Sequence, residues 1–532
     1  MSRYLSLALL AVPAVLGLDC AEEFISSAIA DYENATVNYV YAVAEGDSFG
    51  IPSLAFPDNA TKLPAVCAVG INVKSSEDSS YNFGLILPDT TWNSRFLATG
   101  NGGFGGGINW PDMGIFSHYG FATMSTDTGH NATAVSTGDW GLNKPESLVD
   151  WGYRAMHGSV ELSKHIISEY YAPPTGIQYS YYASCSTGGR QGLREAQLYP
   201  QDFDGISVGA PAWWSPHLAA QTLHAGLLNY PTNSSSYVDP SLFPAIVTEM
   251  VEQCDPQDGL TDGIISDPFG CNFDYQALLC TSDNGTDCLS SEQLETVYNF
   301  YNDWTDENDT LIFPGAALGA DASVLMGSIV PLGYGYFENW VLNDTTWDYT
   351  QLDYADIQLA DEIDPGDATA DAFDMSPFMH KGGKIMMYHG GADVLIPTGS
   401  SKVFYDKVND TLTPQGVNLD DFYRFFLIPG MSHCSGSDSA PWYIAGGSQS
   451  LDNVTHSVPG YEDASHDVIL ALMDWVEHGM APDQLIATKF VNDNASLGVQ
   501  VQRPLCVYPK QAKYTGSGDE NAPENWECQS VE

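Results

Sequence analysis

The sequence predicts an α/β fold with a mostly parallel sheet, on three observations. Short apolar runs bounded by turn residues recur along the chain, as buried strands do. Stretches with a helical spacing of apolar residues lie between these runs, and strands that alternate with helices favour a parallel sheet covered on both faces. Of the 532 residues 44% are hydrophobic and only 16% are charged, which indicates a globular chain.

The expected elements follow one another from about residue 81. The predicted strands are residues 83–87, 95–99, 178–183, 384–388 and 423–428, and the predicted helices are residues 151–170, 189–198 and 468–478. Between residues 211 and 373 the alternation of predicted strands and helices stops, and this segment contains four of the cysteines. We interpret it as an insertion that caps the sheet. The predicted domains are therefore a sheet domain of residues 18–210 and 374–532 and a large inserted lid domain of residues 211–373.

The N-terminus has the features of a secretory signal peptide. A single basic residue, Arg3, precedes a short apolar run over residues 4–15, and small residues follow. A membrane anchor is the alternative, but an anchor needs about 20 apolar residues and this run stops short of that length. We expect residues 1–17 to be removed and the mature chain, which starts near Leu18, to be secreted and extracellular.

Two further features agree with export. The ten cysteines include no C-x-x-C pair and are expected to form disulfides in an oxidising compartment. The tripeptide N-x-S/T, which accepts N-linked glycans, occurs at Asn34, Asn59, Asn131, Asn233, Asn284, Asn308, Asn343, Asn409, Asn453 and Asn494. This density predicts a glycoprotein.

The chain is strongly acidic, with 18 basic and 68 acidic residues and a formal charge of −50. Such a field repels polyanions, which argues against nucleic acid and anionic membranes as partners. The charge is typical of a solvated surface on an enzyme that works in acidic surroundings.

Residues 184–190, Ser-Cys-Ser-Thr-Gly-Gly-Arg, lie where a predicted strand gives way to a helix. In a nucleophile elbow the serine occupies a strained turn, and the residues two before it and two after it must be small so that the backbones can approach. Here these residues are Ser184 and Gly188. Ser186 is therefore the candidate nucleophile.

The base and the acid that such a serine requires follow later in the chain. A histidine must take the hydroxyl proton, and a carboxylate must orient the histidine. Asp393 follows strand 384–388 and His433 follows strand 423–428, so both fall at the carboxyl ends of strands. Either residue alone would more often be structural. Their order after the serine is that of the α/β-hydrolases, which favours a triad of Ser186, Asp393 and His433.

A cysteine adjoins each end of this triad, because Cys185 precedes the serine and Cys434 follows the histidine. A disulfide between them, with Cα atoms roughly 4.4–6.8 Å apart, would tie the nucleophile to the base. Spacing alone leaves open that these cysteines pair elsewhere. The other candidate pairs are Cys254 with Cys271, Cys280 with Cys288, Cys20 with Cys67 and Cys506 with Cys528.

A glycine-rich loop, residues 101–107, follows strand 95–99. Its backbone N–H groups can point at a substrate oxygen, and we expect Gly103 and Thr187 to donate to the oxyanion. A phosphate-binding loop is the alternative, but no Lys-Ser/Thr follows and no dinucleotide fingerprint is complete.

Residues 254–264 place Asp255, Asp258 and Asp262 in a short loop with two glycines. Hard oxygen ligands in this arrangement suit calcium, although the spacing is not that of an EF-hand and a plain solvated turn would look the same. Four histidines, His130, His157, His165 and His389, have no metal-ligand spacing. We interpret His389 as a residue packed beside the acid.

Together these motifs resemble the fungal tannase and feruloyl esterase family of α/β-hydrolases over nearly the whole mature chain. The resemblance is carried by residues 99–103, 185–192, 199–206, 254–264 and 423–434. The paired Cys-Ser and His-Cys motif is close to diagnostic. The chain departs from many members of the family at Ser184, where glycine is usual, and over residues 104–110.

The resemblance implies an α/β-hydrolase fold, the triad clipped by Cys185–Cys434, and a lid that carries a structural calcium ion. The calcium ligands that it implies are the side chains of Asp255, Asp258 and Asp262 and the backbone oxygens of Leu260 and Ile264.

The predicted function is that of a serine carboxylesterase acting on phenolic acid esters, foremost feruloyl (hydroxycinnamoyl) esters of plant cell-wall polysaccharide. A tannase acting on galloyl esters is the first alternative, and an acyltransferase with the same triad is a more distant one. A non-catalytic, calcium-stabilised glycan-binding protein on a hydrolase scaffold is the alternative from another class. Such proteins usually lack a triad member, whereas all three candidates are present here.

Overall fold

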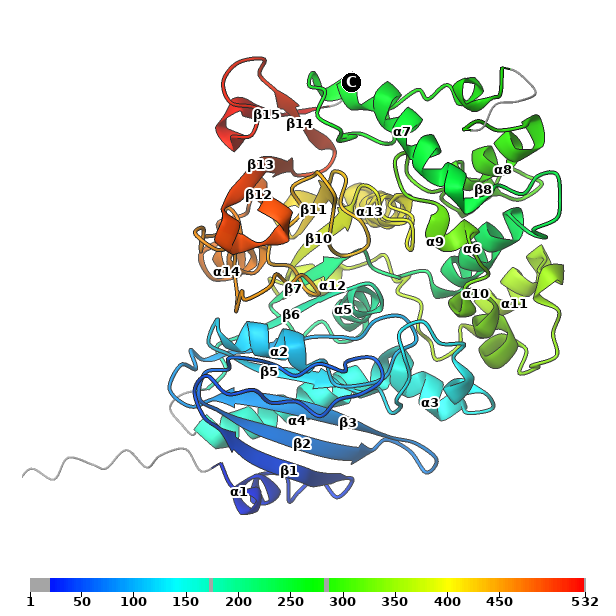
Figure 1. Cartoon of the computed structure of the whole chain (residues 1–532). Coiled ribbons are helices and arrows are strands. Elements are labelled where there is room, and N and C mark those ends of the chain that lie inside the picture. Colours follow the sequence, from blue (N-terminus) through cyan, green and yellow to red (C-terminus); the bar gives the residue numbers. More distant parts are fainter. Residues whose placement is uncertain (1–19, 172–175, 282–286, 531–532) are drawn as a thin grey trace, which may run out of the picture.

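The computed structural model describes residues 20–171, 176–281 and 287–530 (Figure 1). The predicted signal peptide, residues 1–17, and the glycan acceptor Asn284 lie outside the described residues. None of the described helices combines the length and the apolar character needed to cross a membrane.

A nine-stranded sheet in the order β1-β2-β3-β5-β4-β6-β7-β10-β11 forms the centre of the molecule. Its strands are β1 (Ala35–Val43), β2 (Val66–Lys74), β3 (Ser80–Pro88), β4 (Arg95–Ala98), β5 (Phe121–Thr126), β6 (Tyr179–Cys185), β7 (Gly205–Gly209), β10 (Lys384–Gly390) and β11 (Tyr423–Ile428). The pairings from β1 to β5 are antiparallel, and every pairing from β5 through β4, β6, β7 and β10 to β11 is parallel. The prediction of a mostly parallel sheet is confirmed.

Helices cover both faces of the sheet, as the apolar spacing predicts. The helices outside residues 211–373 are α1 (Glu22–Ala28), α2 (Trp110–Ser117), α3 (Pro145–Val149), α4 (Ala155–Tyr171), α5 (Thr187–Leu198), α12 (Ser376–His380), α13 (Gly399–Leu412) and α14 (Val468–His478). One core contains Val160 of α4, Leu193 of α5 and Phe404 of α13. The core on the other face contains Phe116 of α2 and Leu472 of α14.

Residues 211–373 form a helical group that lies to one side of the sheet (green in Figure 1). Its elements are α6 (Ser215–Leu228), α7 (Phe243–Cys254), α8 (Ser291–Tyr301), β8 (Trp304–Thr305), β9 (Leu311–Phe313), α9 (Ser323–Met326), α10 (Pro331–Tyr336) and α11 (Tyr354–Ile363). A separate apolar cluster joins α6, α7, α8 and α9. A second one packs Trp340 and Tyr336 of this segment against Trp151 and Phe104. The assignment of residues 211–373 as a lid domain stays a prediction.

Several strands of the structure were not predicted from the sequence. They are β1, β2, β5, β7, the short pair β8 with β9, and the C-terminal pairs β12 (Gln484–Phe490) with β13 (Val499–Cys506) and β14 (Lys510–Tyr514) with β15 (Trp526–Ser530). Strand β7 reads Gly-Ile-Ser-Val-Gly and β5 reads Phe-Ala-Thr-Met-Ser-Thr, so neither is a continuous apolar run. Both are buried because a strand pairs on each side and helices cover the faces of the sheet, which is information from tertiary structure.

All ten cysteines are paired. The disulfides are Cys20–Cys67, Cys185–Cys434, Cys254–Cys271, Cys280–Cys288 and Cys506–Cys528. These are the pairs considered from the sequence.

Candidate active site

Ser186 occupies a sharp turn between β6 and α5. Its backbone angles, φ 64° and ψ −126°, lie in a region that residues other than glycine rarely adopt. The surrounding chain holds this turn, since the Ser186 N–H donates to the Gly209 carbonyl at 2.9 Å and its own carbonyl accepts from the N–H groups of Arg190 and Ala212 at 3.0 and 3.1 Å. The geometry is that of a nucleophile elbow.

The small residues around this turn are packed against each other. A Cβ atom on Gly188 would lie 2.0 Å from the Ser184 hydroxyl oxygen, and one on Gly189 would lie 2.6 Å from the Gly209 carbonyl oxygen. Both positions therefore require glycine. Ser184 fits at its position because Gly188 leaves room for its hydroxyl.

Asp393 and His433 meet beyond the ends of β10 and β11. The His433 Nδ1 lies 2.7 Å from the Asp393 Oδ2, and the Oδ1 of the same carboxylate accepts from the N–H groups of Leu395 and Ile396 at 2.9 and 3.0 Å. Burial raises the pKa of Asp393, but the nearby charge of His433 and the hydrogen bonds from His389 and His433 outweigh it and hold the pKa below its ordinary value. The acid is therefore ionised and suited to orient an imidazole.

A second histidine contacts the same carboxylate. The fully buried His389 places its Nε2 3.1 Å from the Asp393 Oδ2 and 2.9 Å from the Ile396 carbonyl, and its Nδ1 2.7 Å from the Ser401 hydroxyl. The packed position expected for His389 agrees with this geometry. Nothing in the sequence predicts its hydrogen bond to Ser401, which belongs to α13.

The Cys185–Cys434 disulfide joins the residue before Ser186 to the residue after His433. Its Cα atoms lie 5.9 Å apart and its cysteines are separated by 249 residues in the sequence. This covalent bond fixes the elbow against the loop that carries the histidine.

The glycine-rich loop lies next to the start of α5. Gly103 has φ +52°, and the Thr187 hydroxyl donates to the Gly103 carbonyl at 3.0 Å. Among the described residues, the N–H groups of Gly103 and Thr187 have no hydrogen-bond acceptor, and Thr187, as the first residue of α5, has no partner within its helix. Two unpaired donors beside Ser186 can stabilise an oxyanion.

Asn101 anchors this loop, although the sequence did not single it out for that role. Its side-chain amide donates to the carbonyls of Gly107 and Thr126 at 2.9 and 3.0 Å. Gln191 of α5 accepts from the Asn101 N–H at 3.0 Å and donates to the Asn101 side chain at 3.1 Å. These hydrogen bonds therefore fix the position of the glycine-rich loop relative to α5.

Ser186 and His433 both line a cavity of about 550 Å³. Most of the side chains around it are apolar, and they come from the sheet domain as well as from residues 211–373. These apolar residues are Phe56, Phe104, Ala134, Val135, Trp151, Ala212, Leu218, Ala219, Val324, Leu325, Val330, Pro331, Leu332, Leu395 and Ile396.

The aspartate loop lies apart from this cavity, after the end of α7. Asp255 and Asp258 are buried, and among the described residues neither forms an ion pair with a lysine or arginine. Asp262 pairs with Arg503 at 2.6 Å, and its pKa is raised by burial and by the negative charges of the other two aspartates. Among the described residues, the carbonyl oxygens of Leu260 and Ile264 accept no hydrogen bond. Among the described residues the three aspartates do not offer one carboxylate oxygen each within 4.8 Å of one another, so only the missing cationic partner of Asp255 and Asp258 and the free carbonyl oxygens suit a calcium ion.

The site has the arrangement of the serine α/β-hydrolases. The serine lies in an elbow of a mainly parallel sheet, the acid and the histidine follow later strands, and oxyanion donors lie beside the serine. A model of the family described as tannase and feruloyl esterase matches residues 65–345 and 328–529. The chain therefore belongs to this family of carboxylic ester hydrolases.

Curated relatives cover most of the chain. It is 35% identical to a probable feruloyl esterase B-2 of Aspergillus oryzae over 513 residues, which are 93% of each protein. It is also 35% identical to a probable feruloyl esterase B-1 of Aspergillus terreus, over 87% of this chain and 86% of that protein.

Solved structures agree with the fold. The crystal structure of feruloyl esterase B from Aspergillus oryzae superposes with a TM-score of 0.86 at 32% identity, over 96% of this chain and 100% of that one. A tannin acyl hydrolase from Aspergillus niger superposes with a TM-score of 0.75 at 22% identity, over 96% of this chain and 95% of the other, which is a likeness of fold.

Proposed function

We propose that this chain is a secreted esterase that hydrolyses feruloyl esters of plant cell-wall polysaccharide. The observation that carries the proposal is that Ser186 and His433, joined through the adjacent disulfide, line one mainly apolar cavity. The names of its relatives, feruloyl esterases B, support the choice of acyl group.

In the reaction, His433 takes the proton of the Ser186 hydroxyl as that oxygen attacks the ester carbonyl. Asp393 orients the His433 ring and stabilises the imidazolium that forms. The N–H groups of Thr187 and Gly103 bind the carbonyl oxygen as it becomes negative. His433 then protonates the leaving sugar alcohol, and water attacks the acyl-enzyme by the same route in reverse to release the phenolic acid.

The lining of the cavity favours a feruloyl over a galloyl group. A galloyl ring carries three hydroxyl groups, each of which needs a hydrogen-bond partner when water is excluded. Apolar side chains, including Phe104, Trp151 and Leu332, outnumber the polar ones around the cavity, and these suit a hydroxycinnamoyl ring with its vinyl linker.

Calcium is proposed as a structural ion in the loop after α7. The carboxylates of Asp255, Asp258 and Asp262 and the carbonyl oxygens of Leu260 and Ile264 would hold it. The ion would neutralise buried negative charge there and so stabilise the loop. It takes no part in the ester chemistry.

Secretion and glycosylation are proposed together. The disulfides suit an oxidising compartment, and the described glycan acceptors are exposed or half-buried, so each can receive a glycan. The signal peptide would be residues 1–17.

The test is hydrolysis of methyl ferulate beside methyl gallate by purified protein, with Ser186→Ala as the control. We expect turnover of ferulate, little turnover of gallate, and a loss of at least about a thousandfold in kcat for the variant. Turnover of gallate alone would replace the proposal with a tannase. Activity that survives in the variant would remove Ser186 as the nucleophile.

A further inference from the structure

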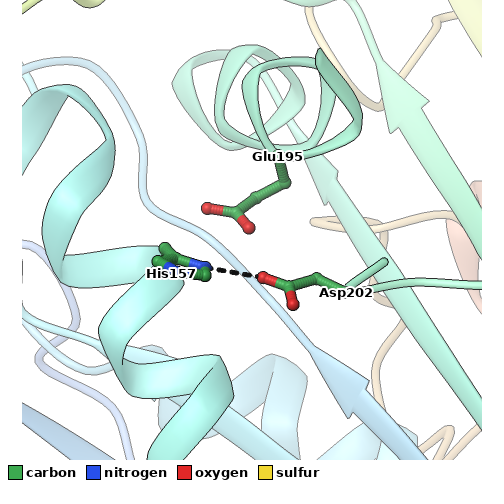
Figure 2. Close-up of side chains that lie close together, drawn as sticks. All are labelled: His157, Glu195 and Asp202. Carbon is green, nitrogen blue, oxygen red and sulfur yellow. Dashed lines mark hydrogen bonds and ion pairs between the residues drawn. The ribbon is translucent and has the colours of Figure 1, made fainter. Parts of the chain in front are cut away.

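Three chemically active side chains meet near the C-terminal end of α5. His157 comes from α4, Glu195 from α5, and Asp202 from the turn between α5 and β7 (Figure 2). One ligand atom from each lies within 4.8 Å of the others. We propose that these three side chains bind a divalent transition-metal ion of the zinc type.

The Glu195 carboxyl group provides the first argument. Glu195 is 1% exposed, and its Oε2 is buried with no hydrogen-bond partner. Figure 2 shows this carboxyl group directed into the space between His157 and Asp202. A buried carboxyl oxygen without a partner costs free energy, and a bound cation would satisfy it.

The orientation of His157 provides the second argument. Its Nδ1 faces Asp202, 2.8 Å from the Oδ2, while its Nε2 lies 3.4 Å from the Oε2 of Glu161. Tyr199 stacks on the imidazole with ring centroids 3.4 Å apart, which fixes the plane of the ring. A metal-bound histidine normally directs its other N–H to a carboxylate, and Glu161 occupies that place.

Lys164 is a cationic side chain beside the cluster. The side chain of Lys164 donates to the backbone carbonyl of Asp202 and not to its carboxylate, whose Oδ2 lies 2.8 Å from the His157 Nδ1. A metal ion between the Glu195 and Asp202 carboxylates would give both groups a cationic partner.

The ligand set identifies the class of metal. One imidazole nitrogen and two carboxylates match the His/Asp/Glu ligands of zinc sites, and a water molecule could complete four-coordination. His157 and Asp202 are partly exposed, which gives an ion a way in. Calcium prefers six to eight oxygen ligands, so the two proposed metal sites differ in selectivity.

The sequence could not reveal this cluster, because its members lie on three different elements. Their spacings of 38 and 7 residues match no metal-binding motif. Glu195 lies on the helix that begins directly after Ser186. A metal ion at this site would link the C-terminal end of α5, the helix that follows Ser186, to α4.

The experiment is calorimetric titration of Zn²⁺ into the full-length protein, first stripped with a chelator and then returned to excess Ca²⁺. We expect one Zn²⁺ per chain and a melting temperature that rises with Zn²⁺. His157→Gln and Glu195→Gln should each weaken binding at least about tenfold. Cobalt should give a visible absorption band in the wild-type protein that His157→Gln lacks.

The matched control is His466→Gln. His466 is also a partly buried histidine paired with a carboxylate, Asp463 at 2.9 Å, but it belongs to no three-ligand group among the described residues. This variant should bind Zn²⁺ as the wild type does. The proposal is overturned if the wild type binds no stoichiometric Zn²⁺, or if His157→Gln binds it unchanged. If circular dichroism shows that Glu195→Gln does not fold, Zn²⁺ binding by His157→Gln alone is the test, since His157 is partly exposed.

Discussion

The hydroxyl of Ser184 and the missing side chain of Gly188 are complementary. The position that a Cβ atom on Gly188 would occupy lies 2.0 Å from the Ser184 Oγ and 3.1 Å from the Asn101 carbonyl oxygen. The elbow therefore tolerates serine two residues before the nucleophile because the residue two after the nucleophile is glycine.

Gly188→Ala should lower both activity and stability, by about 1–3 kcal/mol in the free energy of unfolding, because the added methyl group overpacks the elbow. Ser184→Gly removes the clashing hydroxyl, so the double variant should recover a large part of both. The measurements are kcat on methyl ferulate and urea unfolding of the single and double variants. If Gly188→Ala behaves as the wild type, or if Ser184→Gly gives no recovery, the two positions do not share this space.

At the scale of elements, the aspartate loop connects distant parts of the chain. It follows α7, it is closed by the Cys254–Cys271 disulfide, and Asp262 pairs with Arg503 of β13. Its buried carboxylates therefore affect the packing of the helical segment on the C-terminal strands.

Removal of calcium with a chelator should lower the melting temperature by about 5 °C, because buried like charges lose their counter-ion. Asp258→Asn should reduce this response. At temperatures well below melting, kcat should hardly change, since the loop lies apart from Ser186. Differential scanning calorimetry with and without Ca²⁺ measures the effect.

The exposed Asp239→Asn in the same segment is the control for loss of one charge, and it should keep the full calcium response. If neither the chelator nor added Ca²⁺ changes the melting temperature of the wild-type protein, the loop is a plain turn.

Across the whole molecule, buried acids and a formal charge of −50 link stability to pH. Burial raises the pKa of Asp467 from 3.8 to about 6, against the lowering effect of hydrogen bonds from Ser457 and Tyr119. An acid with a raised pKa in the folded chain favours folding fully below its unfolded pKa, and this contribution is lost as pH rises through about 6. Repulsion among surface carboxylates increases over the same range.

The free energy of unfolding should therefore fall between about pH 4 and pH 7.5, and Asp467→Asn should show a smaller fall, by on the order of 3 kcal/mol. Urea unfolding at several pH values measures both slopes. The exposed Asp452→Asn removes one charge elsewhere and should keep the wild-type slope. Identical slopes for Asp467→Asn and the wild type would contradict the role given to Asp467.

The sequence was most informative where local rules determine structure. The strand, turn and helix around Ser186 could be predicted because the elbow depends on residues that are neighbours in sequence. Strands 384–388 and 423–428 could be predicted because they are apolar runs. The edges were less accurate, since α5 begins at Thr187 and not at residue 189. The N–H groups that could bind an oxyanion start there, at the first turn of the helix.

By itself the sequence determined the class of fold, the order of serine, acid and histidine, and the family, because these depend on residue types and their order along the chain. Only the tertiary structure decided which residues meet across it. In the folded chain His389 and His433 contact the same carboxylate, and two separate segments line one cavity. His157, Glu195 and Asp202 come together from three elements. The physical reason is that such contacts depend on how helices pack on the sheet, and packing joins residues whose separation in sequence carries no periodic signal.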